Sequence, residues 1–109
     1  MYISNMAHFL DENGNIAGVM PREGRVMASF LAMVIDASTT MMEEGVVDVE
    51  IRCNRQGCQG AILAEICPCM KEIHWGCTEC DNDGIISGWR GTKWDNSGGR
   101  TLSDEAVNI

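Results

Sequence analysis

Two cysteine pairs in the second half of the chain decide its fold: residues 53–58, CNRQGC, and residues 77–80, CTEC. The first pair has four intervening residues and the second has two, and both spacings are typical of turns whose sulfurs bind one metal ion. The segment between the pairs is long enough for one β-hairpin, which would bring the turns together. We therefore predict one structural Zn2+ ion, bound by Cys53, Cys58, Cys77 and Cys80.

A site of four thiolates has no open coordination position for water. Such a zinc ion would stabilise the fold and would not catalyse a reaction. Iron, alone or in an iron–sulfur cluster, also binds four thiolates, but the ribbon-type spacing favours zinc. The alternative interpretation is a set of ordinary buried thiols, because free cysteine is among the most buried residue types.

Two further cysteines, Cys67 and Cys69, flank Pro68 where the predicted hairpin turns. The simplest interpretation is two thiols at the tip, because cysteines so close together make a strained disulfide and only Lys71 could lower a thiol pKa. The alternatives are a redox pair, a partial second metal site with His74, or the replacement of a ligand of the first pair. A lone histidine on a strand is usually hydrogen-bonded, so His74 itself is not predicted to be a ligand.

The segments around the cysteines predict an antiparallel zinc ribbon. Residues 46–52 alternate apolar and charged side chains, as a half-buried strand does. Three more short apolar runs predict the remaining strands: 61–66, 72–76 and 85–90. We expect Trp75 and Trp89 in the core, and Trp94 either in the core or on a binding surface.

The first half of the chain predicts a hairpin and a helix. Asn13-Gly14 lies between apolar runs at 6–10 and 16–20, which favours an N-terminal hairpin. Apolar residues then recur at helical spacing from about Pro21 to Met42, which predicts one long amphipathic helix. The fold class is therefore α+β.

The domain organisation follows from the same pattern. We expect a single domain over residues 1–100, with the hairpin and helix in 1–45 and the zinc-ribbon-like half in 46–100. Residues 101–109 are polar enough to form a disordered tail.

Charge and hydropathy limit the partners and the compartment. The formal net charge is −8, and residues 52–100 carry equal numbers of acidic and basic side chains, which disfavours binding to a nucleic-acid backbone. The longest apolar stretch, residues 26–35, is about half of the ~20 residues that a membrane span requires. No secretory signal is recognised, so we expect a cytoplasmic protein with reduced cysteines.

Three segments carry a resemblance to a group of small bacterial proteins of uncharacterised function: residues 73–80, IHWGCTEC, residues 84–92, GIISGWRGT, and the Trp94-Asp95 pair. That group has an HW-x-C-x2-C segment followed by I-x-GW-x-G-T-x-WD. The resemblance implies a zinc-ribbon-like half behind an amphipathic helix, and it implies no activity. Thr78 and Asp81 depart from the proline and glycine that the group has at these positions, which implies a lower metal affinity.

Three functions remain open at this stage. No nucleophile beside a base and no phosphate-binding loop is identified, so we do not expect an enzyme. The first hypothesis is a non-enzymatic protein-interaction module. The second is a nucleic-acid-associated ribbon, in which Arg90, Lys93 and Arg100 lie near two tryptophans. The third is thiol redox chemistry or metal handling through Cys67 and Cys69.

Overall fold

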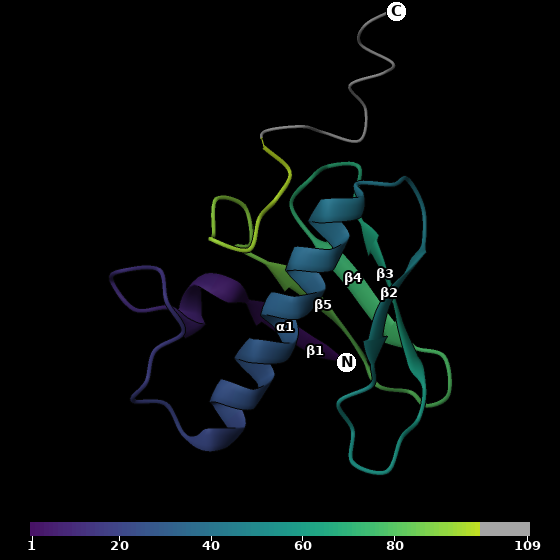
Figure 1. The fold of residues 1–109 in the computed structure, drawn as a ribbon, viewed down its shortest axis with the longest axis horizontal. Helices are drawn as coiled ribbons and strands as arrows, with labels where there is room; N and C mark the ends of the chain where they lie inside the picture. Colours follow the sequence, from purple (N-terminus) through teal and green to yellow (C-terminus); the bar gives the residue numbers. More distant parts are fainter. Residues whose placement is uncertain (99–109) are drawn as a thin grey trace, which may run out of the picture.

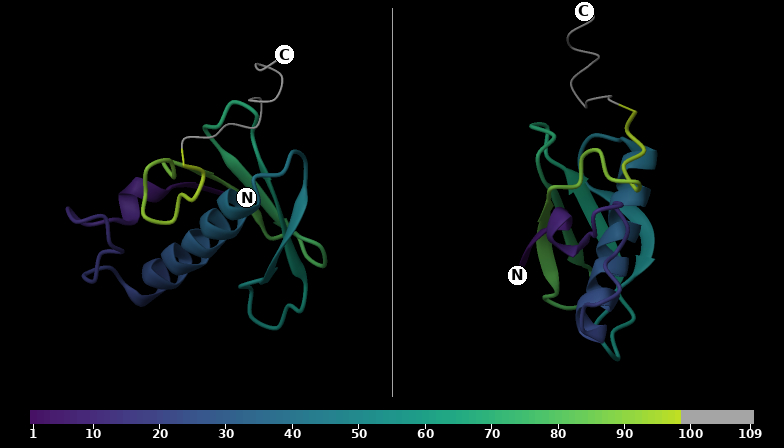
Figure 2. Two further views of the ribbon diagram at one scale, coloured as in Figure 1. Left: turned by 45° about the horizontal axis from the view of Figure 1, so that its top comes forward. Right: turned by 90° about the vertical axis from the view of Figure 1, so that its left-hand side faces the viewer.

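A mixed five-stranded sheet carries one long helix across one of its faces (Figures 1 and 2). The computed structural model describes residues 1–98. In chain order the elements are β1 (Tyr2–Asn5), the 3-10 helix η1 (Met6–Phe9), α1 (Arg22–Met41), β2 (Val47–Arg52), β3 (Ala61–Ile66), β4 (Ile73–Cys77) and β5 (Asp83–Ser87). The predicted α+β class is confirmed.

The strands lie in the order β1-β5-β4-β3-β2. Strands β2 to β5 pair antiparallel with their neighbours in sequence, whereas β1 pairs parallel with β5. The strands that carry the cysteines therefore share one sheet with the start of the chain. The predicted ribbon, a self-contained antiparallel unit, does not include this parallel strand.

Strand β2 shows the predicted alternation, since Val49 and Ile51 are buried and the charged residues that alternate with them are exposed. Its pairing with β3 is irregular between Asp48 and Arg52. Glu50 lies at this irregularity with φ 59°, and its amide donates to the Asp48 carboxylate at 2.8 Å. Val49, Ile51 and Cys53 are all buried, so the same face of this segment stays in the core across the irregularity.

Helix α1 matches the predicted helix to within one residue at each end. Pro21 precedes its first turn, where a missing N–H has no cost. The helix ends at Met41, before the glycine at position 45. Met42 adopts φ 49° and its amide donates to the Ser38 carbonyl at 2.9 Å, which closes the last turn before Gly45.

The predicted N-terminal hairpin is not confirmed as a pair of strands. Residues 6–9 form η1, and the two apolar runs meet in one antiparallel bridge, between Leu10 and Ile16. Two backbone hydrogen bonds flank this bridge, from the Asp11 amide to the Asn15 carbonyl and from the Ala17 amide to the Phe9 carbonyl. Local side-chain hydrogen bonds explain the difference. Asn5 accepts from the Ala7 amide at 3.0 Å, and Asp11 accepts from two amides of the following loop at 2.8 and 3.0 Å. The Asn5 bond caps η1, which takes the place of a strand, whereas the Asp11 bonds stabilise the turn between the two runs.

The last strand lies about two residues earlier than predicted. Gly88, with φ 64°, ends β5, and a Cβ at this position would collide with the Asn5 side chain. Trp89 then turns into the core and is fully buried. Trp75 is also buried, so both expected core positions are confirmed. Trp94 is half-buried and packs against the same core.

The core lies between α1 and the sheet. Its largest fully buried side chains include Trp89, Met6, Leu31, Ile35 and Ile62. Among residues 1–98, no helix has the length and apolar character that a membrane crossing requires. The predicted tail at 101–109 lies outside the described residues.

Candidate metal centre

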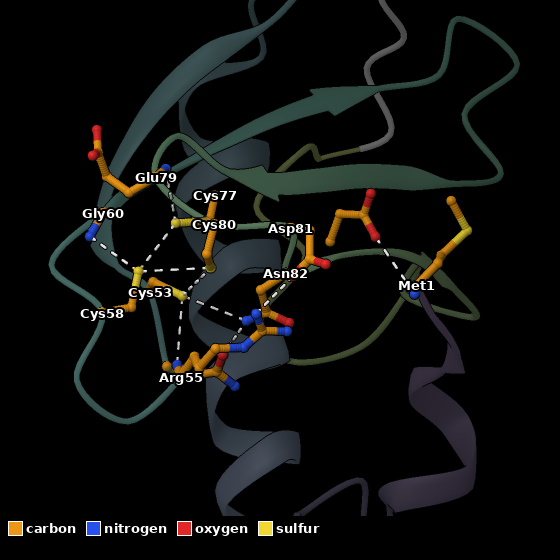
Figure 3. A network of polar contacts seen from close by, with 12 residues as sticks. Met1, Cys53, Arg55, Cys58, Gly60, Cys77, Glu79, Cys80, Asp81 and Asn82 are labelled. Atoms are coloured by element: carbon orange, nitrogen blue, oxygen red, sulfur yellow. Dashed lines mark hydrogen bonds and ion pairs between the residues drawn. The ribbon is translucent and has the colours of Figure 1, made fainter.

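The four predicted ligand cysteines come together at one end of the sheet (Figure 3). All four Sγ atoms lie within 4.8 Å of one another. Three Sγ–Sγ separations are 3.8 Å for Cys53–Cys80, 3.5 Å for Cys58–Cys77 and 3.6 Å for Cys58–Cys80. Ligands at ~2.3 Å from a tetrahedral zinc would be about 3.8 Å apart. The four sulfurs therefore fit the donor set of one metal ion.

Two loops present these sulfurs, and each is closed by a backbone hydrogen bond. In the β2–β3 loop the Cys53 amide donates to the Gly60 carbonyl at 2.9 Å. In the β4–β5 loop the Cys77 amide donates to the Asn82 carbonyl at 2.9 Å. The antiparallel pairing of β3 with β4 places the two loops side by side. The hairpin between the cysteine pairs thus does what the sequence predicted.

Backbone amides two residues ahead point at the sulfurs. Arg55 N–H donates to Cys53 Sγ at 3.4 Å, Gly60 N–H to Cys58 Sγ at 3.4 Å, and Glu79 N–H to Cys77 Sγ at 3.3 Å. A hydrogen bond to the charged form stabilises a thiolate, which is the form that binds metal. The loop backbone is therefore arranged for thiolates.

The pKa values of the clustered cysteines differ widely, because the thiolates repel one another when no cation lies between them. Burial raises the pKa of Cys53, but hydrogen bonds from Asn82 and the Arg55 amide outweigh it and lower the pKa to about 7. The Gly60 amide lowers the pKa of Cys58, but burial and the neighbouring thiols raise it to about 12. One thiolate therefore forms readily, and its negative charge hinders the deprotonation of the next thiol. A divalent cation between the sulfurs would offset this repulsion.

Asn82 is the site residue that the sequence interpretation missed. It is buried, and its side-chain amide donates to Cys53 Sγ at 3.5 Å and to Asn54 Oδ1 at 2.8 Å. The residues after Cys80 were interpreted only as a turn. The available signal was the position of Asn82, two residues beyond a candidate ligand cysteine, where the chain bends back toward the four sulfurs.

Asp81 links the two loops. Its carboxylate forms an ion pair with Arg55 at 2.7 Å, and the guanidinium lowers the pKa of Asp81 by this hydrogen bond. Asp81 does not adopt the positive φ that a glycine would allow. Both side chains are substantially exposed, so solvent screens the pair and it adds little to stability. The positive charge of Arg55 also lies close to Cys80 and Cys53.

Gly60 is required by close packing. It is buried, and a Cβ at this position would collide with Cys77 Sγ and lie 3.0 Å from the Glu79 side chain. Its amide also donates to Cys58 Sγ. A single residue therefore contacts ligands from both pairs.

The two other cysteines take no part in this cluster. Cys67 and Cys69 are bonded to each other as a disulfide, in place of the two free thiols expected at the tip. Their place at the β3–β4 turn also excludes either of them as a replacement ligand in this structure. His74 is exposed and contacts Glu72 at 3.3 Å. Within residues 1–98 no second group of three metal-ligating side chains is found.

Comparisons with known proteins identify no relative. No protein-family model, no curated protein and no solved structure matches the chain. The resemblance to the small bacterial proteins stays a prediction.

The Gly60→Ala substitution is expected to weaken metal binding at least about tenfold, because the added Cβ must displace Cys77 Sγ. Competition with a chelator of known affinity measures the change. The matched control is Gln59→Ala, an exposed neighbour in the same loop. Equal affinity of the Gly60→Ala and Gln59→Ala variants would contradict the close packing described above.

The Asn82→Ala substitution is expected to make metal affinity more dependent on pH. Without the side-chain donor, the pKa of Cys53 should rise from about 7 toward its ordinary value of 9.0. A higher pKa means that more protons must be displaced on metal binding. The affinity deficit should therefore be largest below about pH 7 and shrink as the pH approaches 9.0.

Chelator competition at several pH values tests this expectation, with Gln56→Ala as the control in the neighbouring loop. A deficit that is the same at every pH would show that Asn82 acts only through packing.

Proposed function

We propose that this chain is a non-enzymatic protein-interaction module whose fold is stabilised by one structural zinc ion, bound by Cys53, Cys58, Cys77 and Cys80. The observation that carries the proposal is the group of four sulfurs within 4.8 Å of one another. Four thiolates complete the coordination of a tetrahedral ion, so a substrate or water would find no open position. A closed site of this kind supports a role in folding.

Zinc is favoured over other metals by the donor set. Four thiolates select zinc or iron among common metals, and the fit to a tetrahedral edge of about 3.8 Å holds for zinc at ~2.3 Å. The site would carry a net charge of −2 with zinc bound. Arg55, which lies beside Cys53 and Cys80, offsets part of this charge.

The interaction surface that we propose is the sheet face opposite α1. Cross-strand pairing places two rows of side chains on it. One row contains Asp48, Leu63, Gly76 and Asp83, and the other contains Glu65, His74, Ile85 and Ile3. Ile3 is 81% exposed, and Leu63 and Ile85 are half-buried. This outer face therefore combines an apolar centre with acidic margins.

The chemistry of the outer face indicates its partner. Three carboxylates lie in the two rows, on Asp48, Glu65 and Asp83, and no lysine or arginine lies in either row. The N-terminal amine of Met1 pairs with Asp83 at 3.7 Å, which leaves Asp48 and Glu65 as the carboxylates without this cation. Gly76 leaves a hollow between Leu63 and Asp83 that a partner side chain could enter. We propose that a protein segment with basic side chains around an apolar centre binds here.

The nucleic-acid alternative has less support. Trp89 is fully buried and offers no ring for base stacking, while Arg90 lies 6.0 Å from the centre of this ring. Lys93 likewise lies 5.9 Å from the ring of Trp94, and Arg100 lies outside the described residues. The acidic outer face would repel a phosphate backbone.

Elemental analysis of the purified protein tests the metal. We expect one zinc ion per chain in the wild type. The Cys80→Ser variant should lose this zinc together with cooperative unfolding, because metal binding contributes directly to folding. The Cys69→Ser variant is the matched control and should keep both. A wild type that contains no metal and unfolds cooperatively would overturn the structural role.

Selection of peptides from a random displayed library tests the interaction surface. Peptides that bind the zinc-loaded wild type should be enriched in basic and apolar residues. We expect the Ile3→Arg substitution to weaken their binding at least about tenfold, because it removes an apolar contact and repels a basic partner. The Val26→Arg variant, which changes an exposed residue of α1, is the control.

Zinc content and thermal unfolding of both variants would be measured first, so that a loss of binding is not a loss of fold. If the selected peptides bind both variants equally, or carry no basic residues, the outer face is not the interaction surface. Tight salt-dependent binding to DNA or RNA would favour the second hypothesis instead.

A further inference from the structure

The β3–β4 turn carries a second pair of cysteines at the end of the sheet opposite the metal centre (Figure 1). We propose that Cys67 and Cys69 form a redox-active dithiol–disulfide site that exchanges with small disulfides and thiols. This site goes beyond the proposed interaction function and does not depend on it. Glutathione is the representative of the substrate class.

The backbone of the turn brings the two sulfurs together. The sulfurs are bonded, and the Cα atoms are 5.2 Å apart, within the usual range of ~4.4–6.8 Å for a disulfide. Two backbone hydrogen bonds close the turn: Cys67 N–H donates to the Glu72 carbonyl at 2.9 Å, and Met70 N–H donates to the Cys67 carbonyl at 2.7 Å. Neither bond uses a sulfur, so both can persist when the disulfide is reduced.

Met70 anchors the turn in the core. Its side chain is only 2% exposed, and its backbone adopts φ 62°, which a non-glycine residue rarely does. Such a conformation persists only where the surrounding structure holds it. The turn is therefore fixed by core packing as well as by its hydrogen bonds, and reduction should leave the two thiols as close neighbours.

The two sulfurs also have the amide environment of the metal-site cysteines. Cys69 N–H donates to Cys67 Sγ at 3.3 Å, and Lys71 N–H donates to Cys69 Sγ at 3.4 Å. Hydrogen bonds of this kind favour the thiolate, which is the attacking and the leaving form in thiol–disulfide exchange. The exposed Lys71, two residues beyond Cys69 in sequence, adds a positive charge to the same turn.

The two thiols differ in access. Cys69 is exposed and Cys67 is half-buried. An external reagent should therefore react first at Cys69, and Cys67 should act as the resolving thiol. This order is set by burial and can be tested residue by residue.

The exchange is balanced with a disulfide RSSR as the oxidant. The Cys69 thiolate attacks one sulfur of RSSR, forms a mixed disulfide and releases one RS−. The Cys67 thiolate then attacks Cys69 Sγ, which forms the internal disulfide and releases the second RS−. Two protein thiols have lost two electrons and two protons, and RSSR has become two RSH. Reduction by two thiols is the reverse sequence.

The Cys67–Cys69 pair and the four clustered cysteines lie at opposite ends of strands β3 and β4. Strands β3 and β4 run between the two cysteine groups, and neither Cys67 nor Cys69 belongs to the metal-ligating group. Metal binding should protect the other four cysteines from the same oxidant. The two groups should therefore respond independently.

The test places the zinc-loaded full chain in buffers of graded ratios of reduced to oxidised glutathione. Rapid alkylation and mass spectrometry of peptides then count the free thiols. We expect two of the six cysteines, Cys67 and Cys69, to be lost together in one two-electron step while zinc is retained. The metal-site cysteines should become reactive only after a chelator is added.

Single variants identify the order of attack. Cys67→Ser should accumulate one glutathione on Cys69, because no resolving thiol remains, and Cys69→Ser should form its mixed disulfide more slowly at the half-buried Cys67. The proposal is overturned if both cysteines remain alkylatable in the most oxidising buffer. It is also overturned if they oxidise only as zinc is lost, or if the reduced pair binds a metal ion of its own and resists oxidation.

Discussion

The structure depends on the convergence of four sulfurs that belong to two loops far apart in sequence. Cys53 and Cys58 precede β3, and Cys77 and Cys80 follow it on the far side of a hairpin. Their sulfurs meet only if β3 and β4 pair in the observed register, so the metal centre and the sheet constrain each other. A small chain buries a limited core, and a metal ion bound by the four sulfurs would supplement that core at the end of the sheet.

The parts that the sequence predicted are those in which local pattern and tertiary contact agree. The apolar periodicity of α1 and the alternation of β2 each describe an element with one buried face. The cysteine spacing predicted which four sulfurs come together, because two turns joined by one hairpin leave few other groupings. Trp75 and Trp89 were predicted to lie in the core because a small sheet needs large side chains to fill the space beside it, and both are buried.

The parts that failed depend on contacts that no local pattern encodes. The parallel pairing of β1 with β5 joins the two ends of the described chain, and nothing in residues 2–5 points to it. The expected N-terminal hairpin amounts to one bridge, between Leu10 and Ile16, because η1 occupies residues 6–9. Asn82 contributes through a single donor atom aimed at Cys53, which only the folded loop reveals.

The most direct test of the metal centre is X-ray absorption spectroscopy of the purified protein at the metal edge. The account predicts zinc with four sulfur ligands at ~2.3 Å and no nitrogen or oxygen ligand, because Cys53, Cys58, Cys77 and Cys80 complete the coordination. A spectrum with fewer than four sulfurs, or with a nitrogen or oxygen ligand at ~2.0 Å, would contradict it, since the site would then be open or differently composed.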